Sequence, residues 1–266
     1  MVNLKSFTLF FCRIPVLSHG LATLLLLASC AGIDRHSTTD MGNKIKSPEE
    51  EKAIEIPVRP VHMSKGEFFA FMTPMIEVEN ARVLKNRAHL LQLKPLAHLQ
   101  TRAGAWLHQI AGEYRVPLNG KPDNRFWHRI LTRVDIIPLE IALAQAANES
   151  AWGNSRFARE ANNYFGQWCF QKGCGVVPLR RNADARHEVK RFVSPTSSVR
   201  AYMKNVNTLH AYETFRKIRQ AMRHQGKALD AELLALGLKQ YSERGTDYVR
   251  IIRSIIRKNR KLMRKS

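Results

Sequence analysis

Apolar residues recur at helical spacing over most of the chain, whereas strand-like alternation is confined to one short segment. The first predicted helix begins at Ser64, and Pro74 and Pro95 should each end or kink a helix. Residues 154–195 differ, because they are rich in Gly, Asn and Arg and contain one convincing strand, 187–193. The pattern predicts a mainly α protein of the α+β class, in which a helical domain carries a small irregular β-containing lobe.

The helices that this spacing predicts are 64–74, about 75–93, 96 to about 114, a short helix capped by Asp123, 139–149, and four more that start near Ser197, Phe215, Leu229 and Thr246.

The segment 139–153 is an almost wholly apolar helix whose late acid, Glu149, falls where the helix should stop. Burial disfavours the charged form of a carboxyl group there, and so does the negative end of the helix dipole. Both effects raise the pKa of Glu149, which suits a general acid at neutral pH. Gly153 is suited to a helix C-cap. On these arguments alone, an ordinary exposed helix end is an equally good interpretation of Glu149.

The first thirty residues have the pattern of an export signal. Lys5 and Arg13 precede an apolar run over 16–28 that is too short to span a bilayer permanently. The run ends in Leu-Ala-Ser-Cys, which resembles the cleavage box of bacterial lipoproteins. We therefore expect residues 1–29 to be a signal peptide and Cys30 to carry a lipid anchor. An ordinary secretory signal with an incidental cysteine is the alternative.

Charge narrows the choice of partners. The chain has 43 Lys and Arg against 22 Asp and Glu, a net charge of +21, which implies an anionic partner. Export makes nucleic acid a poor candidate and favours peptidoglycan carboxylates, phosphorylated envelope polymers and lipid headgroups. Residues 30–58 are polar without periodicity and indicate a flexible tether to a folded domain at 59–266. Ala31 lacks the acidic residue associated with inner-membrane retention, so we expect an outer-membrane location facing the periplasm.

Two of the four cysteines remain after the signal peptide and the lipid anchor are assigned. Cys169 and Cys174 lie in Cys-Phe-Gln-Lys-Gly-Cys, and an oxidising compartment favours a disulfide that closes this loop. Zinc is a weak alternative, because there is no second cysteine pair and no nearby histidine at ligand spacing. We expect no metal and no cofactor.

A second motif follows ten residues after Gly153, where the chain reads Asn163-Tyr-Phe-Gly-Gln-Trp168. The order Glu-Ser-x-Trp-Gly and then Asn-x-Phe-Gly closely resembles the lysozyme-like N-acetylglucosaminidases of glycoside hydrolase family 73, which cut peptidoglycan. The resemblance to one envelope member of this group is closer still. It rests on Asn148, the cysteine loop and Lys-Arg-Phe-x-Ser at 190–194. The resemblance covers about residues 60–260 and implies a lysozyme-like helical domain.

The resemblance makes Glu149 the general acid that protonates the glycosidic oxygen. A second acid is expected in the small lobe, where Glu188 is the first candidate and Asp184 the second. Tyr241 matches the leading tyrosine of the family pattern Tyr-Ala-Thr-Asp-x-x-Tyr with an insertion, and is expected to orient the substrate. The residues expected to contact the sugar are Ser150, Trp152, Asn163, Phe165 and Gly166.

The resulting hypothesis is a monomeric envelope lipoprotein that hydrolyses β-1,4 bonds of N-acetylglucosamine in peptidoglycan. A lytic transglycosylase is the nearest alternative, although such enzymes typically continue Glu-Ser-x-Phe and then Gly-Leu-Met-Gln. A non-catalytic lipoprotein that binds the cell wall would also suit the charge and the anchor. The sequence leaves inverting, retaining and substrate-assisted mechanisms open.

Overall fold

The computed structural model describes residues 62–99, 104–179, 181, 186–242 and 244–265. The predicted signal peptide and tether, with the lipidation site Cys30, lie outside these residues, as does Asp184. Among the helices that are described, none has the length and apolar composition needed to cross a bilayer.

Helix α1 (Lys65–Leu93) begins as the sequence predicts, in a reciprocal cap. The Ser64 hydroxyl accepts a 3.3 Å hydrogen bond from the backbone N–H of Glu67, whose carboxylate accepts a 2.8 Å bond from the N–H of Ser64. Pro74, which was predicted to end or kink the helix, does not end it, because α1 continues through it. A proline in a helix interior costs about 3 kcal/mol, but the residues on both sides are buried in the core and hold the helix together: Phe71, Met72, Met75 and Ile76.

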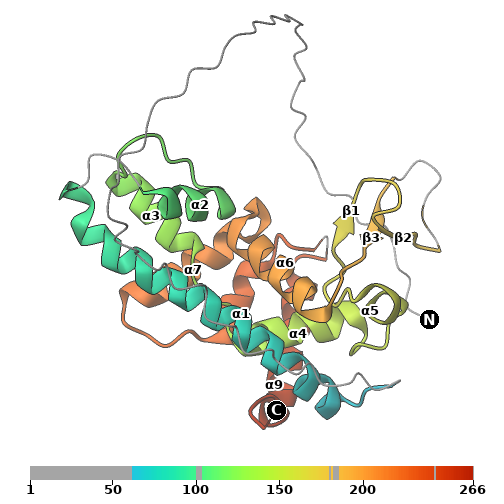
Figure 1. Ribbon diagram of the computed structural model, residues 1–266. Coiled ribbons are helices and arrows are strands. Elements are labelled where there is room, and N and C mark those ends of the chain that lie inside the picture. The colour runs from blue at the N-terminus through green and yellow to red at the C-terminus, as the bar shows by residue number, and fades with distance from the viewer. Residues whose placement is uncertain (1–61, 100–103, 180, 182–185, 243, 266) are drawn as a thin grey trace, which may run out of the picture. The chain divides into compact units, whose positions relative to one another are not determined.

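The other helical segments of the described chain are η1 (Lys94–Leu99), α2 (Ala105–Glu113), α3 (Asn124–Arg133), α4 (Leu139–Ser150), α5 (Arg156–Ala161), α6 (Pro195–Thr208), η2 (His210–Tyr212), α7 (Glu213–His224), α8 (Ala231–Ala235), η3 (Leu236–Leu238) and α9 (Thr246–Met263) (Figure 1).

Two predicted helices are shorter than expected. The segment expected to be helical from 96 to 114 is divided, and α2 starts only after Gly104, which is extended. The segment from Leu229 to Tyr241 holds only α8 and η3. Gly237 explains the close packing of η3, because a Cβ there would lie 2.4 Å from the Cα of Phe215 in α7. The chain approaches α7 there more closely than a side chain would allow.

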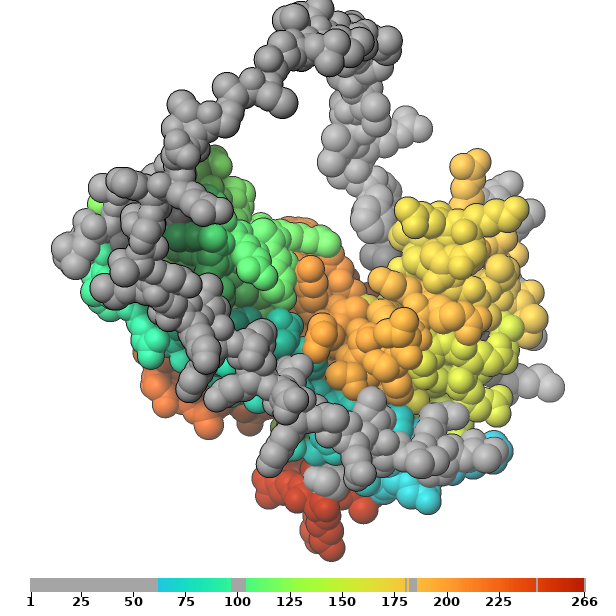
Figure 2. All heavy atoms as spheres, viewed as in Figure 1, coloured from blue at the N-terminus to red at the C-terminus, as the bar shows by residue number. Residues whose placement is uncertain are grey.

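The small lobe is a three-stranded antiparallel sheet in the order β1 (Trp168–Cys169), β3 (Glu188–Lys190), β2 (Gly175–Val176). Strand β3 lies inside the predicted strand, whereas β1 and β2, of two residues each, are too short for a sequence pattern to reveal. Cys169 and Cys174 form the predicted disulfide. The lobe lies beside α5 in Figure 1 and forms the yellow projection in Figure 2. The structure thus confirms a mainly α fold with a small β lobe.

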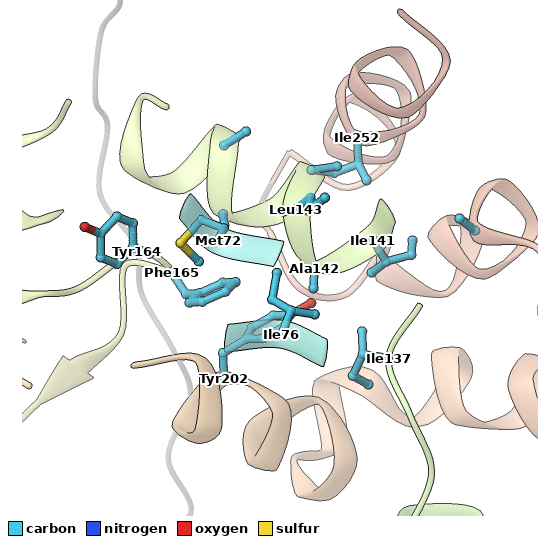
Figure 3. Close-up of a cluster of buried hydrophobic side chains, with 14 of the residues drawn as sticks. Met72, Ile76, Ile137, Ile141, Ala142, Leu143, Tyr164, Phe165, Tyr202 and Ile252 are labelled. Atoms are coloured by element: carbon cyan, nitrogen blue, oxygen red, sulfur yellow. The ribbon is translucent and has the colours of Figure 1, made fainter. Parts of the chain in front are cut away.

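Helix α4 lies at the centre of the larger hydrophobic core and packs against α1, α8 and α9. Its residues from Ile141 to Ala147 are all buried. Figure 3 shows Met72 and Ile76 of α1 gathered with Phe165 and Tyr202 beside this helix. A helix buried on nearly every side explains why the sequence 141–147 is apolar apart from Gln145.

A smaller core lies between the second half of α1 and helices α2 and α3. Its buried residues include Val83, Leu90, Leu107, Phe126 and Ile130. Helix α1 therefore contributes to both cores along its length, the first half to one and the second half to the other.

Candidate active site

Glu149 is the penultimate residue of α4 and is half-buried. The helix ends because Ala151 adopts a left-handed conformation, with φ of 50°, and Trp152 and Gly153 follow with φ of 58° and 75°. The prediction that Gly153 is the C-cap is wrong, since Ala151 takes that position. Left-handed non-glycine residues are energetically costly and often mark functional sites. The turn leaves the Glu149 side chain at the very end of a buried helix.

The two carboxylate oxygens of Glu149 have different surroundings. Oε1 accepts hydrogen bonds from the Tyr248 hydroxyl (3.0 Å) and from the Asn148 amide (3.1 Å). Oε2 accepts none from the described residues and lies 3.6 Å from where a Cβ on the exposed Gly166 would be. This second oxygen therefore faces an exposed glycine, and it is the oxygen available to carry a transferable proton.

Burial raises the pKa of Glu149, as the sequence predicts. The hydrogen bonds from Asn148 and Tyr248 and the positive charge of Arg244 act in the opposite direction, but they do not outweigh burial. A carboxyl group with a raised pKa keeps its proton closer to neutral pH, as a general acid requires.

A line of hydrogen bonds leads from the core to Glu149. The Tyr202 hydroxyl donates to Oε1 of the fully buried Gln145 (2.7 Å), and Nε2 of Gln145 donates to the Tyr248 hydroxyl (2.9 Å), which donates to Glu149. Sequence reasoning missed Gln145 and Tyr248. A signal was present, because Gln145 is the one polar residue within 141–147 and lies four residues before Glu149, on the same helix face.

The turn 163–167 carries Gly166 to the carboxylate. The Asn163 amide donates to the carbonyls of Gln167 and Lys190, both at 2.8 Å. Its oxygen accepts hydrogen bonds from two backbone N–H groups of the turn, those of Phe165 and Gln167. Asn163 therefore fixes the turn onto β3 and holds Gly166 beside Glu149.

Tyr241 lies next to this arrangement. Its hydroxyl donates to the Phe165 carbonyl (3.4 Å), and its ring centre is 5.0 Å from that of Tyr248. Burial raises the pKa of Tyr241 well above its ordinary value, so the phenol stays neutral. The structure thus brings Tyr241 to the site where the sequence expected it.

Glu188 is hydrogen-bonded to the disulfide loop. One carboxylate oxygen accepts the N–H of Gly173 (2.9 Å) and the other accepts the N–H of Gly175 (2.8 Å). These bonds lower the pKa of Glu188. Both oxygens of Glu188 are therefore engaged within the lobe, and its role as the second catalytic acid stays a prediction. Ligand atoms of Cys169, Cys174 and Glu188 lie within 4.8 Å of one another, but the disulfide leaves no thiolate for a metal.

Comparison with known proteins identifies the family. Residues 125–261 match the glucosaminidase family, described as mannosyl-glycoprotein endo-β-N-acetylglucosaminidase. The chain is 32% identical over 199 residues to the protein Bax of Escherichia coli (strain K12), across 75% of this chain and 71% of Bax. The chain belongs to the glucosaminidase family. No solved structure matches it. Glu149, Asn163 and Tyr248 all lie within the family match, and the glucosaminidase is accordingly a glycosidase-type hydrolase of glycans.

Two residues of the first motif have structural roles in this glucosaminidase. Ser150 is fully buried, and its hydroxyl accepts the N–H of Gly153 (2.8 Å). Trp152 packs against α1, with its ring centre 5.5 Å from that of Phe69 and with Nζ of Lys65 4.9 Å from its ring. The Ser150 hydroxyl is thus used within the turn that follows α4, and the contact of the partly exposed Trp152 with the sugar stays a prediction.

Two side chains of the second motif of the glucosaminidase, those of Asn163 and Phe165, are also used inside the fold. The Asn163 side chain is buried and its hydrogen bonds are used inside the turn. The buried Phe165 ring stacks on Tyr202, with ring centres 3.9 Å apart and an angle of 8° between the planes. Both side chains are buried within the fold, and their predicted contact with the sugar stays a prediction. Of the residues expected to bind the sugar, Gly166 is the one that is exposed beside Glu149.

Proposed function

We propose that the protein hydrolyses the β-1,4 glycosidic bond of N-acetylglucosamine in peptidoglycan, with Glu149 as general acid. The observation that carries the proposal is the Glu149 carboxyl group, which has a raised pKa, two donors on Oε1 and an Oε2 that lies beside an exposed glycine. Membership of the glucosaminidase family supports the reaction class, and the predicted export signal supports a substrate in the cell envelope.

In this mechanism Oε2 of Glu149 gives its proton to the glycosidic oxygen as the bond to the anomeric carbon breaks. Negative charge then develops on the carboxylate, and the donors Tyr248 and Asn148 are already aimed at Oε1. Such fixed donors stabilise developing charge without reorganisation. The same carboxylate later takes a proton from the attacking water.

We propose that the substrate's own N-acetyl group acts as nucleophile. The acetamido oxygen attacks the anomeric carbon while the protonated glycosidic oxygen leaves, which forms a cyclic oxazolinium ion. Water then attacks the anomeric carbon and opens this ring. Glu188 is engaged by the disulfide loop, and no other carboxylate of the described residues influences the pKa of Glu149. Both facts favour a mechanism that needs a single protein carboxylate.

We also propose that the protein is a lipoprotein anchored through Cys30 and located at the outer membrane. The support is the basic start, the short apolar run and the Leu-Ala-Ser-Cys box of the sequence. A labelled-fatty-acid incorporation assay on the wild type and on Cys30→Ser tests this. Equal labelling of the two proteins would refute the anchor.

The central test is digestion of purified sacculi, with the products analysed by mass spectrometry. We expect reducing N-acetylglucosamine ends from the wild type and a rate about 10²–10⁴-fold lower from Glu149→Gln, the usual contribution of a general acid. Glu140→Gln, in the first turn of the same helix, is the matched control and should keep wild-type activity. Equal release from wild type and Glu149→Gln would refute the role of Glu149. Anhydro ends would instead indicate a transglycosylase, and wall binding without sugar release would indicate a non-catalytic protein.

A further inference from the structure

Arg244 lies in the loop between two tyrosines of the site. The loop begins after Tyr241, whose hydroxyl contacts the turn 163–167, and ends before Tyr248, whose hydroxyl contacts Glu149. Within the loop the N–H of Gly245 donates to the Ser242 carbonyl at 2.8 Å. Both ends are thus fixed at the site, and the Arg244 side chain between them is exposed.

The guanidinium of Arg244 has no carboxylate partner among the residues that the structure describes. The nearest acid in sequence that is described, Asp247, pairs with Arg250 instead. Asp247 does contact the backbone of Arg244, by donating its N–H to the Arg244 carbonyl at 3.0 Å. The charge of Arg244 is therefore available to a ligand at the site.

This charge works against the general acid. Glu149 must keep a proton, and a nearby cation favours the ionised carboxylate instead. Arg244 is one of the groups that lower the pKa of Glu149. An exposed cation that opposes the chemistry of its neighbour needs another reason to be there, and binding of an anionic substrate group is such a reason.

We propose that Arg244 is a specificity-determining residue that binds a carboxylate carried by the sugar on the leaving-group side of the cleaved bond. The proposal rests on the proposed function. We place Arg244 on the side of the leaving sugar, because that sugar keeps the oxygen that Glu149 protonates. In peptidoglycan that sugar is muramic acid, whose lactyl ether ends in a carboxylate or in a peptide that carries carboxylates. A planar guanidinium can bind a carboxylate through two parallel hydrogen bonds.

Arg244 also lies where this chain departs from the family pattern. The segment 241–248 matches Tyr-Ala-Thr-Asp-x-x-Tyr only with an insertion, and Arg244 lies within the altered spacing. A residue in a loop of changed length is well placed to alter substrate selection without changing the acid, since loops carry specificity on a fixed scaffold.

The test compares three forms of one glycan: strands stripped of peptide with free lactyl carboxylates, the same strands with these groups converted to methylamides, and peptide-bearing strands. The variants are Arg244→Gln, Arg244→Lys and the control Arg250→Gln, an exposed arginine in the first turns of α9. We expect Arg244→Gln to lower kcat/KM on stripped strands about tenfold, as for the loss of a hydrogen-bonded charge. Cleavage of the methylamide strands should not change, and Arg244→Lys should give a smaller loss.

Selective loss on the peptide-bearing strands would also support the proposal and would assign the carboxylate to the peptide. An equal loss on charged and methylamide strands would overturn it, as would an equal effect of Arg250→Gln. These results presuppose a wild type that cleaves the strands. A wild type that cleaves none of the three would refute the proposed function itself, which distinguishes the two failures.

Discussion

The hydroxyl of Tyr248 donates a 3.0 Å hydrogen bond to Oε1 of Glu149 while it accepts a 2.9 Å bond from Nε2 of Gln145. Because the amide of Gln145 occupies a lone pair of the hydroxyl, the phenolic proton is directed toward the carboxylate. The fully buried Gln145 is itself fixed by the Tyr202 hydroxyl. The orientation of the acid is thus determined by residues in the core.

The first prediction concerns Tyr248→Phe. The hydrogen bond from Tyr248 lowers the pKa of Glu149, so its removal should raise that pKa further. The protonated acid would then persist to higher pH, and the alkaline limb of the pH–kcat profile should move upward. We also expect kcat at the optimum to fall about tenfold, because a hydrogen bond to a developing charge is lost.

Tyr241→Phe is the control for this variant. Its hydroxyl contacts the Phe165 carbonyl and not the carboxylate, so the alkaline limb should stay in place. A pH–kcat profile for each variant makes the comparison. An unmoved limb in Tyr248→Phe would contradict the assigned role of Tyr248.

The second prediction concerns the stability of Glu149→Gln. Burial raises the pKa of Glu149 in the folded state above its ordinary value of 4.5. At a pH between the unfolded-state pKa and the raised folded-state pKa, the folded state binds more protons than the unfolded state. The wild type therefore loses stability as the pH rises through this range. Glutamine carries no charge and avoids this loss. We expect Glu149→Gln to melt about 2–4 °C higher near neutral pH, the shift for about 1 kcal/mol at this size, and to melt like the wild type near pH 4. An identical difference at both pH values would argue against a raised pKa.

The third prediction separates two effects of an added side chain: strain of a left-handed backbone, and occupation of the space beside the Glu149 carboxyl group. Gly166 and Gly226 have almost the same φ, 63° and 64°, but a Cβ at Gly166 would lie 3.6 Å from Oε2 of Glu149 whereas one at Gly226 would meet nothing within 4 Å. Alanine at either position should cost about 1–2 kcal/mol of stability through the left-handed backbone. We expect only Gly166→Ala to lose activity, by about tenfold or more, because its methyl group would lie in contact with Oε2, where the glycosidic oxygen must approach at the correct geometry. Thermal melts and sacculus digestion of both variants check this, and equal activities would show that Gly166 does not border the reacting group.

The fourth prediction concerns Glu188→Gln. Hydrogen bonds from Gly173 and Gly175 lower the pKa of Glu188, so its contribution to stability exists above its ordinary pKa and disappears as pH falls through the lowered value. An amide offers one oxygen for two N–H groups, so we expect a lower melting temperature at neutral pH and a smaller difference in acid. The kcat of the folded variant should stay within about threefold of the wild type. A loss of about 10²-fold or more, typical of a catalytic acid or base, would restore Glu188 as a catalytic residue.

The sequence predicted the acid better than it predicted the acid's surroundings. The pattern of an apolar helix that ends in a carboxyl group made Glu149 a candidate, and the family resemblance made it the predicted general acid. Ser150, Asn163 and Phe165 stand in the same motifs, yet they are buried, and the partly exposed Trp152 packs against Phe69 of α1. A motif shows which residues occur together, but hydrogen bonding and burial decide which of them faces the substrate.

Other differences have local causes. Pro74 was expected to end or kink a helix, but α1 continues through it because core packing on both sides outweighs the cost of the missing hydrogen bond. The sequence predicted Glu188 only as a candidate second acid. Its partners are the backbone N–H groups of Gly173 and Gly175, which no side-chain pattern reveals. Tyr248 was visible in the motif, but its contact with Glu149 depends on the packing of α9 against α4.

Because α1 contributes to both hydrophobic cores, it limits how far the protein can be truncated and still fold. The family match begins at residue 125, after α1 and α2, although Phe68, Phe69, Met72 and Ile76 of α1 fill the core around α4. A fragment trimmed to the matched region would leave this apolar wall open to water and would lose the support beneath Glu149. The smallest piece that folds and cleaves should therefore start near Ser64, and a single protease cut within α1 should abolish activity.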